Sequence, residues 1–159
     1  MPNKMTAWGI GRRLGRITYS YLAFTIILHI TRSDIFTITH IPFIVSVILG
    51  TILIIIGLVM WLLGVRIISK AFHEGRLLTK GVYTIVRNPM YSSLIVFISP
   101  GVALWFRSWL IFTVPFVSYI VFKLLIKEEE KYLEEKFGQD YLDYKSKVNA
   151  LIPFPHFTK

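Results

Sequence analysis

The stretch Ile41–Val65 constrains this chain more than any other feature, because it contains no charged residue over 25 positions. A helix rises about 1.5 Å per residue, so a helix of this length exceeds the ~30 Å hydrocarbon thickness of a bilayer. Hydrophobic residues make up 54% of the 159-residue chain, which is high for a water-soluble domain. The stretch therefore predicts a membrane-spanning helix.

Three further uncharged stretches predict three more spans: Ile17–Thr31, Asn88–Phe106 and Ser108–Phe122. Only Arg107 separates the last two, and one helix of their combined length would be too long for a bilayer. We therefore predict a helical hairpin that turns at Trp105–Trp109, with its tryptophans at a membrane interface. The expected fold class is all-α, an integral membrane protein with about four transmembrane helices. We expect one domain, 1–159, with two anchoring spans in 14–65 and a catalytic loop, hairpin and C-terminal segment in 66–159.

The basic residues predict the orientation of these spans. They number four before the first span, one in the first loop, five in Arg66–Arg87, one in the hairpin and seven from Lys123 onward. Positively charged segments stay on the cytoplasmic side, so both termini and the middle loop are expected to be cytoplasmic. This topology, with attraction to anionic membrane lipids, accounts for the net charge of +9, and nucleic-acid binding is not expected.

Two apparent site signals have plainer interpretations. The glycine-rich stretch Gly9–Gly15 superficially resembles a nucleotide-binding loop, but no strand pattern precedes it, so we interpret it as a basic juxtamembrane turn. The four histidines lack the spacing that puts two ligands on one helical face, and the chain has no cysteine. No metal site is expected.

A pair of carboxylates follows the fourth predicted span. The helix continuing from that span has an apolar stripe, on which Glu129 falls while Glu130 lies at its edge; the stripe contains Phe122, Leu125, Ile126, Leu133 and Phe137. A carboxylate on an apolar face near a membrane boundary is costly unless it meets a cation or a hydrogen-bond donor. Glu129 is therefore a candidate functional residue, although a solvated surface helix also fits this charge pattern.

Residues 81–93, GVYTIVRNPMYSS, precede the third predicted span. Asn88 is expected to cap the helix and Pro89 to occupy its first position. Gly81 predicts a turn. Arg87 is either one more positive charge at the cytoplasmic boundary or a functional side chain. A simple helix start and a functional site both remain open for this segment.

Taken together, these segments resemble the isoprenylcysteine carboxyl methyltransferase family. The resemblance covers roughly residues 66–155 and rests on Leu77-Leu-Thr-Lys-Gly81-Val-Tyr83, Arg87-Asn-Pro-Met-Tyr91, Glu129-Glu130, Phe137-Gly138, Tyr141, Tyr144 and Pro153. Family members are integral-membrane enzymes that use S-adenosylmethionine, and they are related to membrane phospholipid N-methyltransferases. The resemblance implies a cytoplasmic cofactor pocket formed by the loop before the third span, the start of that span and the C-terminal part.

By position, the resemblance implies an S-adenosylmethionine site that contains Gly75, Arg76, Leu77, Leu78, Tyr83, Asn88, Pro89, Met90, Tyr91, Glu129 and Glu130. The charges of the methyl donor suit these positions: we expect Glu129 to pair with its ammonium group, Arg87 or a helix-start N–H to meet its carboxylate, and tyrosine faces to support the cation. Glu129 and Arg87 are therefore the candidate catalytic residues. Three positions depart from the eukaryotic members. Asn88 and Gly75 replace histidines, and Leu125 replaces an arginine assigned to the acceptor substrate.

The expected function is methyl transfer to a lipophilic acceptor that enters from the bilayer, with the carboxylate of an isoprenylated cysteine or a similar amphiphile as first choice. A carboxylate is already ionised at neutral pH, whereas an amine must first lose a proton. Three alternatives remain: a phospholipid amine N-methyltransferase, a membrane NADPH reductase of the steroid-reductase type, and a non-catalytic membrane lipid-binding protein. The paired Glu129 and Glu130 argue against the reductase. The oligomeric state is left open.

Overall fold

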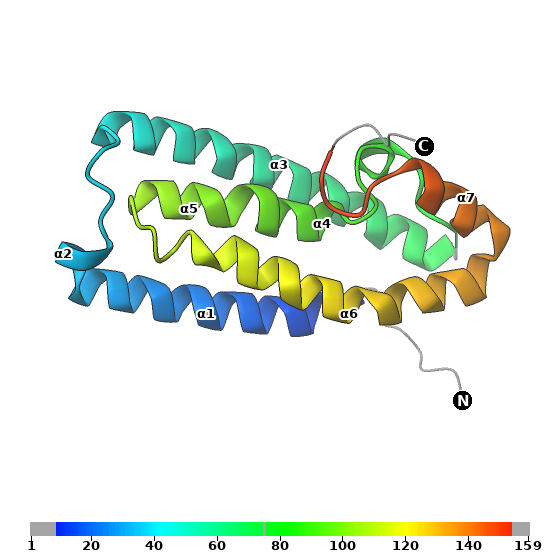
Figure 1. Cartoon of the computed structure of the whole chain (residues 1–159). Coiled ribbons are helices and arrows are strands. Elements are labelled where there is room, and N and C mark those ends of the chain that lie inside the picture. The colour runs from blue at the N-terminus through cyan, green and yellow to red at the C-terminus, as the bar shows by residue number, and fades with distance from the viewer. Residues whose placement is uncertain (1–8, 75, 154–159) are drawn as a thin grey trace.

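The computed structural model describes residues 9–74 and 76–153, and these residues form helices and turns without a strand. In chain order the elements are α1 (Gly11–Thr31), α2 (Ser33–Phe36), α3 (Phe43–Glu74), η1 (Gly81–Thr84), α4 (Pro89–Ser92), η2 (Ser93–Ile98), α5 (Ser99–Trp105), α6 (Thr113–Phe137) and α7 (Gln139–Lys147), as Figure 1 shows. Of the two η elements, η1 is a 3₁₀-helix and η2 is a π-helix. The all-α prediction is confirmed for the described residues.

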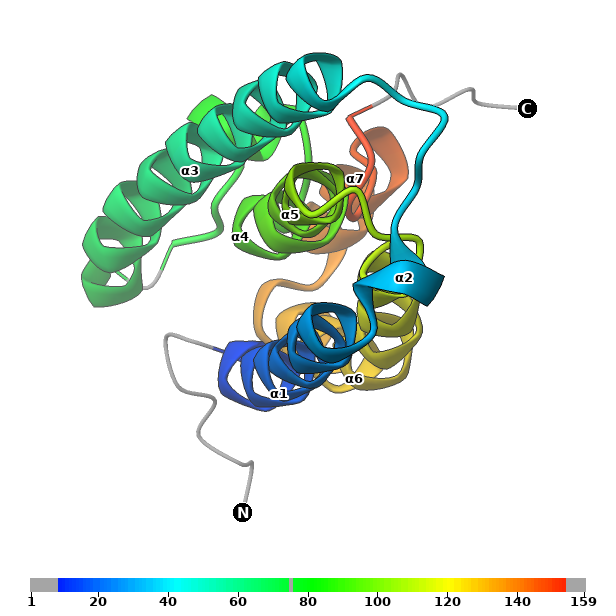
Figure 2. The same ribbon diagram turned by 90° about the vertical axis from the view of Figure 1, so that its left-hand side faces the viewer.

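The helices pack around a central rod. The elements α4, η2 and α5 follow one another without a break, and the rod that they form packs against α3 and against α6. Helix α1 packs along α6. Figure 2 shows the bundle end-on, with the rod between α3 and the pair formed by α1 and α6. The rod therefore contacts helices from both halves of the chain.

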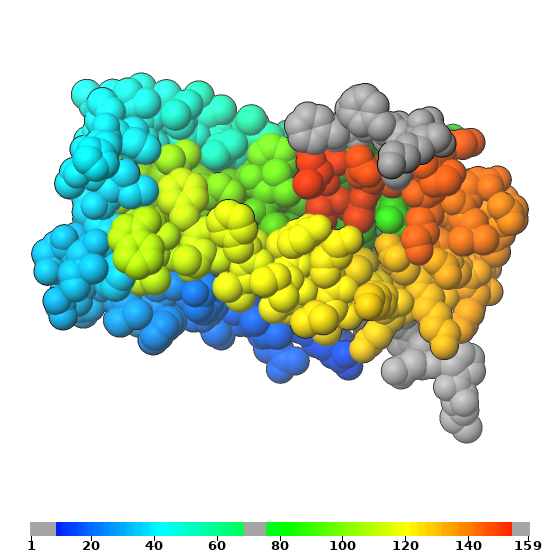
Figure 3. Space-filling view, in the orientation of Figure 1, coloured from blue at the N-terminus to red at the C-terminus, as the bar shows by residue number. Residues whose placement is uncertain are grey.

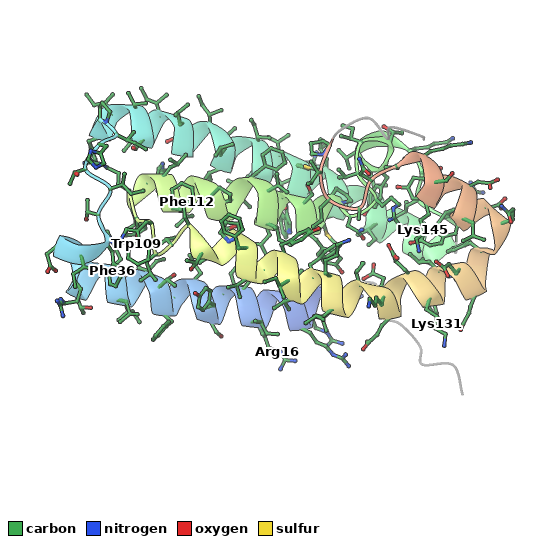
Figure 4. The ribbon with its side chains drawn as sticks, in the orientation of Figure 1. Arg16, Phe36, Trp109, Phe112, Lys131 and Lys145 are labelled. Carbon is green, nitrogen blue, oxygen red and sulfur yellow. The ribbon has the colours of Figure 1, made fainter. Side chains whose placement is uncertain are left out.

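The predicted helical hairpin is confirmed. Helix α5 ends at Trp105 and α6 begins at Thr113. Between them Arg107 adopts a left-handed backbone conformation with φ 48°, which helps the chain to reverse. The ring of Trp109 packs on Phe36 with a centroid separation of 5.2 Å, at the end of the bundle where Figure 4 labels both residues. This contact fastens the turn to α2.

Glycines at a seven-residue spacing let α3 approach the central rod. Gly50, Gly57 and Gly64 all face the rod. A Cβ atom on Gly50 would lie 2.7 Å from the Gly101 carbonyl oxygen, and one on Gly57 would lie 2.7 Å from Ile98 Cγ1. Small residues in this arrangement allow the close helix–helix packing that is common in membranes. This glycine spacing was not among the features predicted from the sequence.

The π-helix η2 lies between Tyr91 and Pro100 in the central rod. Proline has no N–H to donate to the carbonyl four residues earlier, and its ring crowds that carbonyl. The wider turn accommodates this break without ending the rod. The rod therefore continues from α4 through η2 into α5.

Helix α3 contains the one segment, Phe43–Ile68, that is long and apolar enough to cross a membrane among the described residues. Its outward face carries exposed apolar side chains, among them Ile44, Ile48, Ile52, Ile55 and Val59. A face of this kind is expected to contact lipid or another apolar partner. The rod Pro89–Trp105 is also apolar but shorter. Helices occupy most of the other predicted stretches, but among the described residues only α3 is long and apolar enough to span a membrane, so the prediction of four spans is not confirmed.

Candidate functional site

Three segments that are far apart in the sequence meet towards the α7 end of the bundle. They are the start of α1, the start of α4 and the middle of α6 (Figure 1). An apolar cluster joins them to the C-terminal segment, and its buried members are Ile10, Leu14, Tyr91, Ile95, Phe122, Ile126 and Leu151. In the space-filling view of Figure 3 the described C-terminal residues, coloured red, lie beside α6 in yellow. Glu129 lies close to this cluster.

Glu129 is held at one of its two carboxylate oxygens. The Tyr91 hydroxyl donates a hydrogen bond to Oε2 at 3.1 Å, and the Ile10 backbone N–H donates to the same oxygen at 3.2 Å. Both donors are neutral groups. Within the described part of the chain, Oε1 has no hydrogen-bond or ion-pair partner. The carboxylate thus has one anchored oxygen and one oxygen that is available.

The surroundings of Glu129 disfavour its negative charge. Burial raises the pKa of this carboxyl group above its ordinary value, and the charge of Glu130 raises it further, while the hydrogen bonds from Ile10 and Tyr91 lower it in part. The net shift is upward because two neutral donors do not replace the solvation that the carboxylate loses. A cation placed beside the carboxylate would reverse this balance.

The glycines near the N-terminus belong to the same site. A Cβ atom on Gly9 would lie 2.8 Å from Glu129 Cδ, and one on Gly11 would lie 3.3 Å from Tyr91 Cε1. The interpretation of this stretch as only a juxtamembrane turn was therefore incomplete. The hydrogen bond from Ile10 to Glu129 joins residues that are 119 positions apart, and a local sequence pattern cannot predict a contact over that separation. Gly9 and Gly11 permit a close approach of the backbone, and this pair of glycines was the sequence signal that could have indicated the contact.

Glu130, the next residue on α6, belongs to an ionic network instead. It accepts a hydrogen bond from Arg87 Nη1 at 2.9 Å and forms an ion pair with Lys145 at 2.9 Å. Lys145 also reaches Glu134 at 2.7 Å, and Figure 4 labels Lys145 at this end of the molecule. Burial alone would raise the pKa of Glu130, but the bond from Lys145 and the charge of Arg87 together lower it. The charge of Glu130 is thus compensated within the fold.

Arg87 fastens the C-terminal segment to the loop before α4. Its Nε donates to the Val148 carbonyl at 3.0 Å, and its Nη1 donates to Glu130 at 2.9 Å and to Tyr141 at 3.0 Å. The third nitrogen, Nη2, makes no hydrogen bond within the described part of the chain. Two of the three nitrogens therefore serve the fold. A catalytic role for Arg87 stays a prediction.

The predicted helix start is confirmed for Pro89 but not for Asn88. Pro89 is the first residue of α4, whereas the Asn88 side chain makes no capping hydrogen bond. Instead, the Asn88 side-chain amide and backbone N–H both donate to the Ala150 carbonyl, at 3.2 Å and 3.1 Å. The capping prediction was wrong because the C-terminal segment, remote in sequence, supplies an acceptor for these donors.

Tyr83 is the second tyrosine close to Glu129. It is buried, and its carbonyl accepts a hydrogen bond from the Tyr144 hydroxyl at 2.6 Å. Burial raises the pKa of the Tyr83 hydroxyl, and the charge of Glu129 raises it further, which puts the two groups within electrostatic range. Two aromatic side chains, Tyr83 and Tyr91, therefore lie near the carboxylate.

Among the described residues implied by the resemblance, Leu77, Leu78, Pro89 and Met90 make no hydrogen bond to Glu129, and their place in a cofactor site, like that of Arg76, stays a prediction. Pro89 and Met90 pack against α3. Gly75 is outside the described residues. Arg76, Leu77 and Leu78 lie in the loop after α3. Arg76 is exposed, whereas Leu77 and Leu78 are partly buried. In the described ranges, no group of three His, Cys, Asp or Glu side chains is placed to hold a metal ion.

Comparison with known proteins agrees with the motifs around this centre. Residues 45–140, more than half of the chain, match the sequence model of the family described as phospholipid methyltransferase. The chain belongs to this family. A probable protein-S-isoprenylcysteine O-methyltransferase from Oryza sativa subsp. indica is 26% identical over 142 residues, which cover 84% of this chain and 74% of the relative.

A second relative is protein-S-isoprenylcysteine O-methyltransferase B from Arabidopsis thaliana, which is 33% identical over 93 residues. These residues cover 57% of this chain and 45% of the relative. No solved structure matches the chain significantly. The family and the names of the relatives indicate a membrane-associated methyltransferase, and they support the assignment to the isoprenylcysteine carboxyl methyltransferase family. Membership of a methyltransferase family implies a methyl donor.

Proposed function

We propose that this protein transfers a methyl group from S-adenosylmethionine to a lipophilic acceptor in the membrane. One observation carries the proposal: Glu129 is a partly buried carboxylate with one oxygen fixed by neutral donors and the other available, in surroundings that disfavour its charge. Such a group gains most from a cationic ligand. The methyl donor offers two cationic groups, an ammonium and a sulfonium.

The residues of the site suit this ligand. Oε1 of Glu129 would accept hydrogen bonds from the ammonium group. The tyrosine rings of Tyr83 and Tyr91 offer faces that attract a cation, and Nη2 of Arg87 is the candidate partner for the carboxylate of the donor. When bound, S-adenosylmethionine supplies a methyl group that is activated by the positive sulfur. The protein contributes by holding the two reactants in line and by excluding water.

The acceptor that we favour is the carboxylate of an isoprenylated cysteine or a similar amphiphile. The names of the rice and Arabidopsis relatives support this choice. A carboxylate acceptor is already ionised at neutral pH, so the site needs no general base to activate it. The family description, phospholipid methyltransferase, favours a second candidate, the amine of a phospholipid. An amine must lose a proton before it reacts.

The proposal includes a membrane arrangement. The helices would form four spans with both termini on the cytoplasmic side, and the acceptor would enter sideways between helices. The apolar outward face of α3 and the basic residues at the α7 end support this orientation. The centre around Glu129 lies seven residues beyond Phe122, where the fourth predicted span ends. In the proposed arrangement this centre would lie at the cytoplasmic boundary, where a polar donor and an apolar acceptor can meet.

The test is calorimetric titration of S-adenosylmethionine into the detergent-solubilised chain. We expect wild type to bind and Glu129→Gln to bind about ten- to a hundredfold more weakly, because a hydrogen bond to a charged group is lost. The matched control is Glu128→Gln, since Glu128 is the exposed neighbour that pairs with Arg13 at 3.2 Å. The absence of binding by wild type would overturn the proposal and would favour the reductase or the non-catalytic alternative.

A second experiment decides the acceptor. Donor with a labelled methyl group is offered with a farnesyl-cysteine analogue or with vesicles of phosphatidylethanolamine. Label in a base-labile ester of the first compound supports carboxyl methylation. Label in the lipid amine supports the phospholipid alternative and contradicts our first choice of acceptor.

A further inference from the structure

Ile10, the residue before α1, contacts the carboxylate of Glu129 through its backbone N–H. The Ile10 N–H donates to Oε2, and the backbone of Gly11 hydrogen-bonds the Tyr91 hydroxyl, which itself donates to Oε2. Ile10 therefore contacts Oε2 directly, whereas Gly11 contacts the tyrosine hydroxyl that donates to the same oxygen. These contacts leave the orientation of the carboxylate little freedom.

Two glycines make this approach possible. Gly9 has a left-handed backbone with φ 46°, and a Cβ atom there would lie 2.8 Å from Glu129 Cδ. A Cβ atom on Gly11 would lie 3.3 Å from Tyr91 Cε1, which is tighter than ordinary packing. The third glycine of the stretch, Gly15, is different, because a Cβ atom there would meet only the Tyr19 ring of its own helix at 3.4 Å.

We infer that Gly9–Gly11 is a positioning element of the methyl-donor site: it fixes Oε2 of Glu129 so that Oε1 faces the cationic part of the donor. This inference rests on the proposed function. The backbone amides at the start of a helix also carry a partial positive charge, which favours the ionised form of a nearby carboxylate. The glycine pattern near the N-terminus would therefore serve the cofactor without touching it.

The inference predicts a change in pH dependence. The titratable groups that face Glu129 are Tyr83 from η1, Tyr91 from α4 and Glu130 from its own helix. The bonds from Ile10 and Tyr91 lower the pKa of Glu129, so weakening either bond raises it further. Binding of the donor needs ionised Glu129 and is lost as the pH falls through that pKa. A perturbed anchor therefore moves the loss of binding to higher pH.

The test compares Gly9→Ala and Gly11→Ala with the control Gly15→Ala. Affinity for S-adenosylmethionine is measured by calorimetry between pH 5 and pH 8, and thermal unfolding of each variant is recorded. We expect the first two variants to bind about tenfold more weakly at pH 7, from the weakening of a hydrogen bond to a charged group, with their pH midpoints moved upward. Gly15→Ala should match wild type in both respects.

The outcomes separate the two proposals. If wild type does not bind, the proposed function fails and the inference fails with it. If wild type binds and the Gly9 and Gly11 variants keep its affinity and pH midpoint, the inference alone is overturned. Loss of affinity without a shift of the midpoint also overturns it, because a merely structural role explains that result. If Gly9→Ala does not fold, Gly11→Ala decides, since Gly11 is the first helical residue and alanine suits a helix.

Discussion

Glu129 and Glu130 are adjacent on α6, yet their surroundings are opposite. Glu130 is paired with Arg87 and Lys145, and these two cations lower its pKa although burial alone would raise it. Among the described residues, Glu129 meets only neutral donors, and burial raises its pKa. One carboxylate therefore serves the fold, whereas the other carries a charge that the described chain does not neutralise. This contrast between neighbouring carboxylates supports the proposal that a cationic ligand binds beside Glu129.

The largest effect is expected from Arg87→Ala. This change removes hydrogen bonds to Glu130, Tyr141 and the Val148 carbonyl, and it leaves Glu130 with Lys145 as its cation. We expect the free energy of unfolding to fall by about 3 kcal/mol, as is typical when one partner of a buried ion pair is lost. Denaturant unfolding in detergent measures the change. Stability equal to that of wild type would show that Arg87 does not hold the C-terminal segment in place.

Exchanging each carboxylate for an amide separates the two roles. Glu130→Gln should lower the free energy of unfolding by about 2 kcal/mol, because Arg87 and Lys145 lose a charged partner. Glu129→Gln should leave the unfolding temperature unchanged or raise it, because a disfavoured charge is removed from the fold. Thermal unfolding of both variants checks this. If Glu129→Gln is less stable than Glu130→Gln, the assignment of opposite roles to the two carboxylates is wrong.

The affinity for S-adenosylmethionine should depend on pH through Glu129. The raised pKa of Glu129 means that its ionised form, which binds the cation, is lost at a higher pH than for an ordinary glutamate. Below that pKa, affinity should fall about tenfold per pH unit. Glu130 has a lowered pKa and stays ionised over this range. Titrations at several pH values test this, and a profile that persists in Glu129→Gln would assign the titration to another group.

The smallest effect is expected from Glu128→Gln. Glu128 pairs with Arg13, but both side chains are mostly exposed, at 64% and 59%. Exposed ion pairs contribute about 0.5 kcal/mol or less, so stability and donor binding should both stay near the wild-type values. This variant is the control for the loss of one carboxylate charge on α6. A large effect here would mean that any charge change on this part of α6 disturbs the protein.

Much of the fold could be predicted from the sequence because its signals are local. All but the first two residues of the uncharged stretch Ile41–Val65 lie in α3, and the single charge at Arg107 marks the hairpin turn. The apolar stripe of α6 singled out Glu129 as a carboxylate in need of a partner. These features depend on residues within a few helical turns of one another.

The contacts that complete the site could not be predicted, because they join distant segments. The bond from Ile10 to Glu129 spans 119 residues, and the side chain of Asn88 bonds to Ala150 across 62 residues. No local periodicity specifies such partners. The glycine spacing on α3 was visible in the sequence, but its meaning depends on which helix packs against it.

The central claim is that Glu129 binds the ammonium group of the methyl donor. Its most direct test is to compare the affinities of S-adenosylhomocysteine, which carries this ammonium, and methylthioadenosine, which lacks the amino-acid part, for wild type and for Glu129→Gln. We predict that wild type binds S-adenosylhomocysteine about tenfold or more tightly than methylthioadenosine, and that Glu129→Gln largely loses this preference. An equal preference in both proteins would contradict the claim.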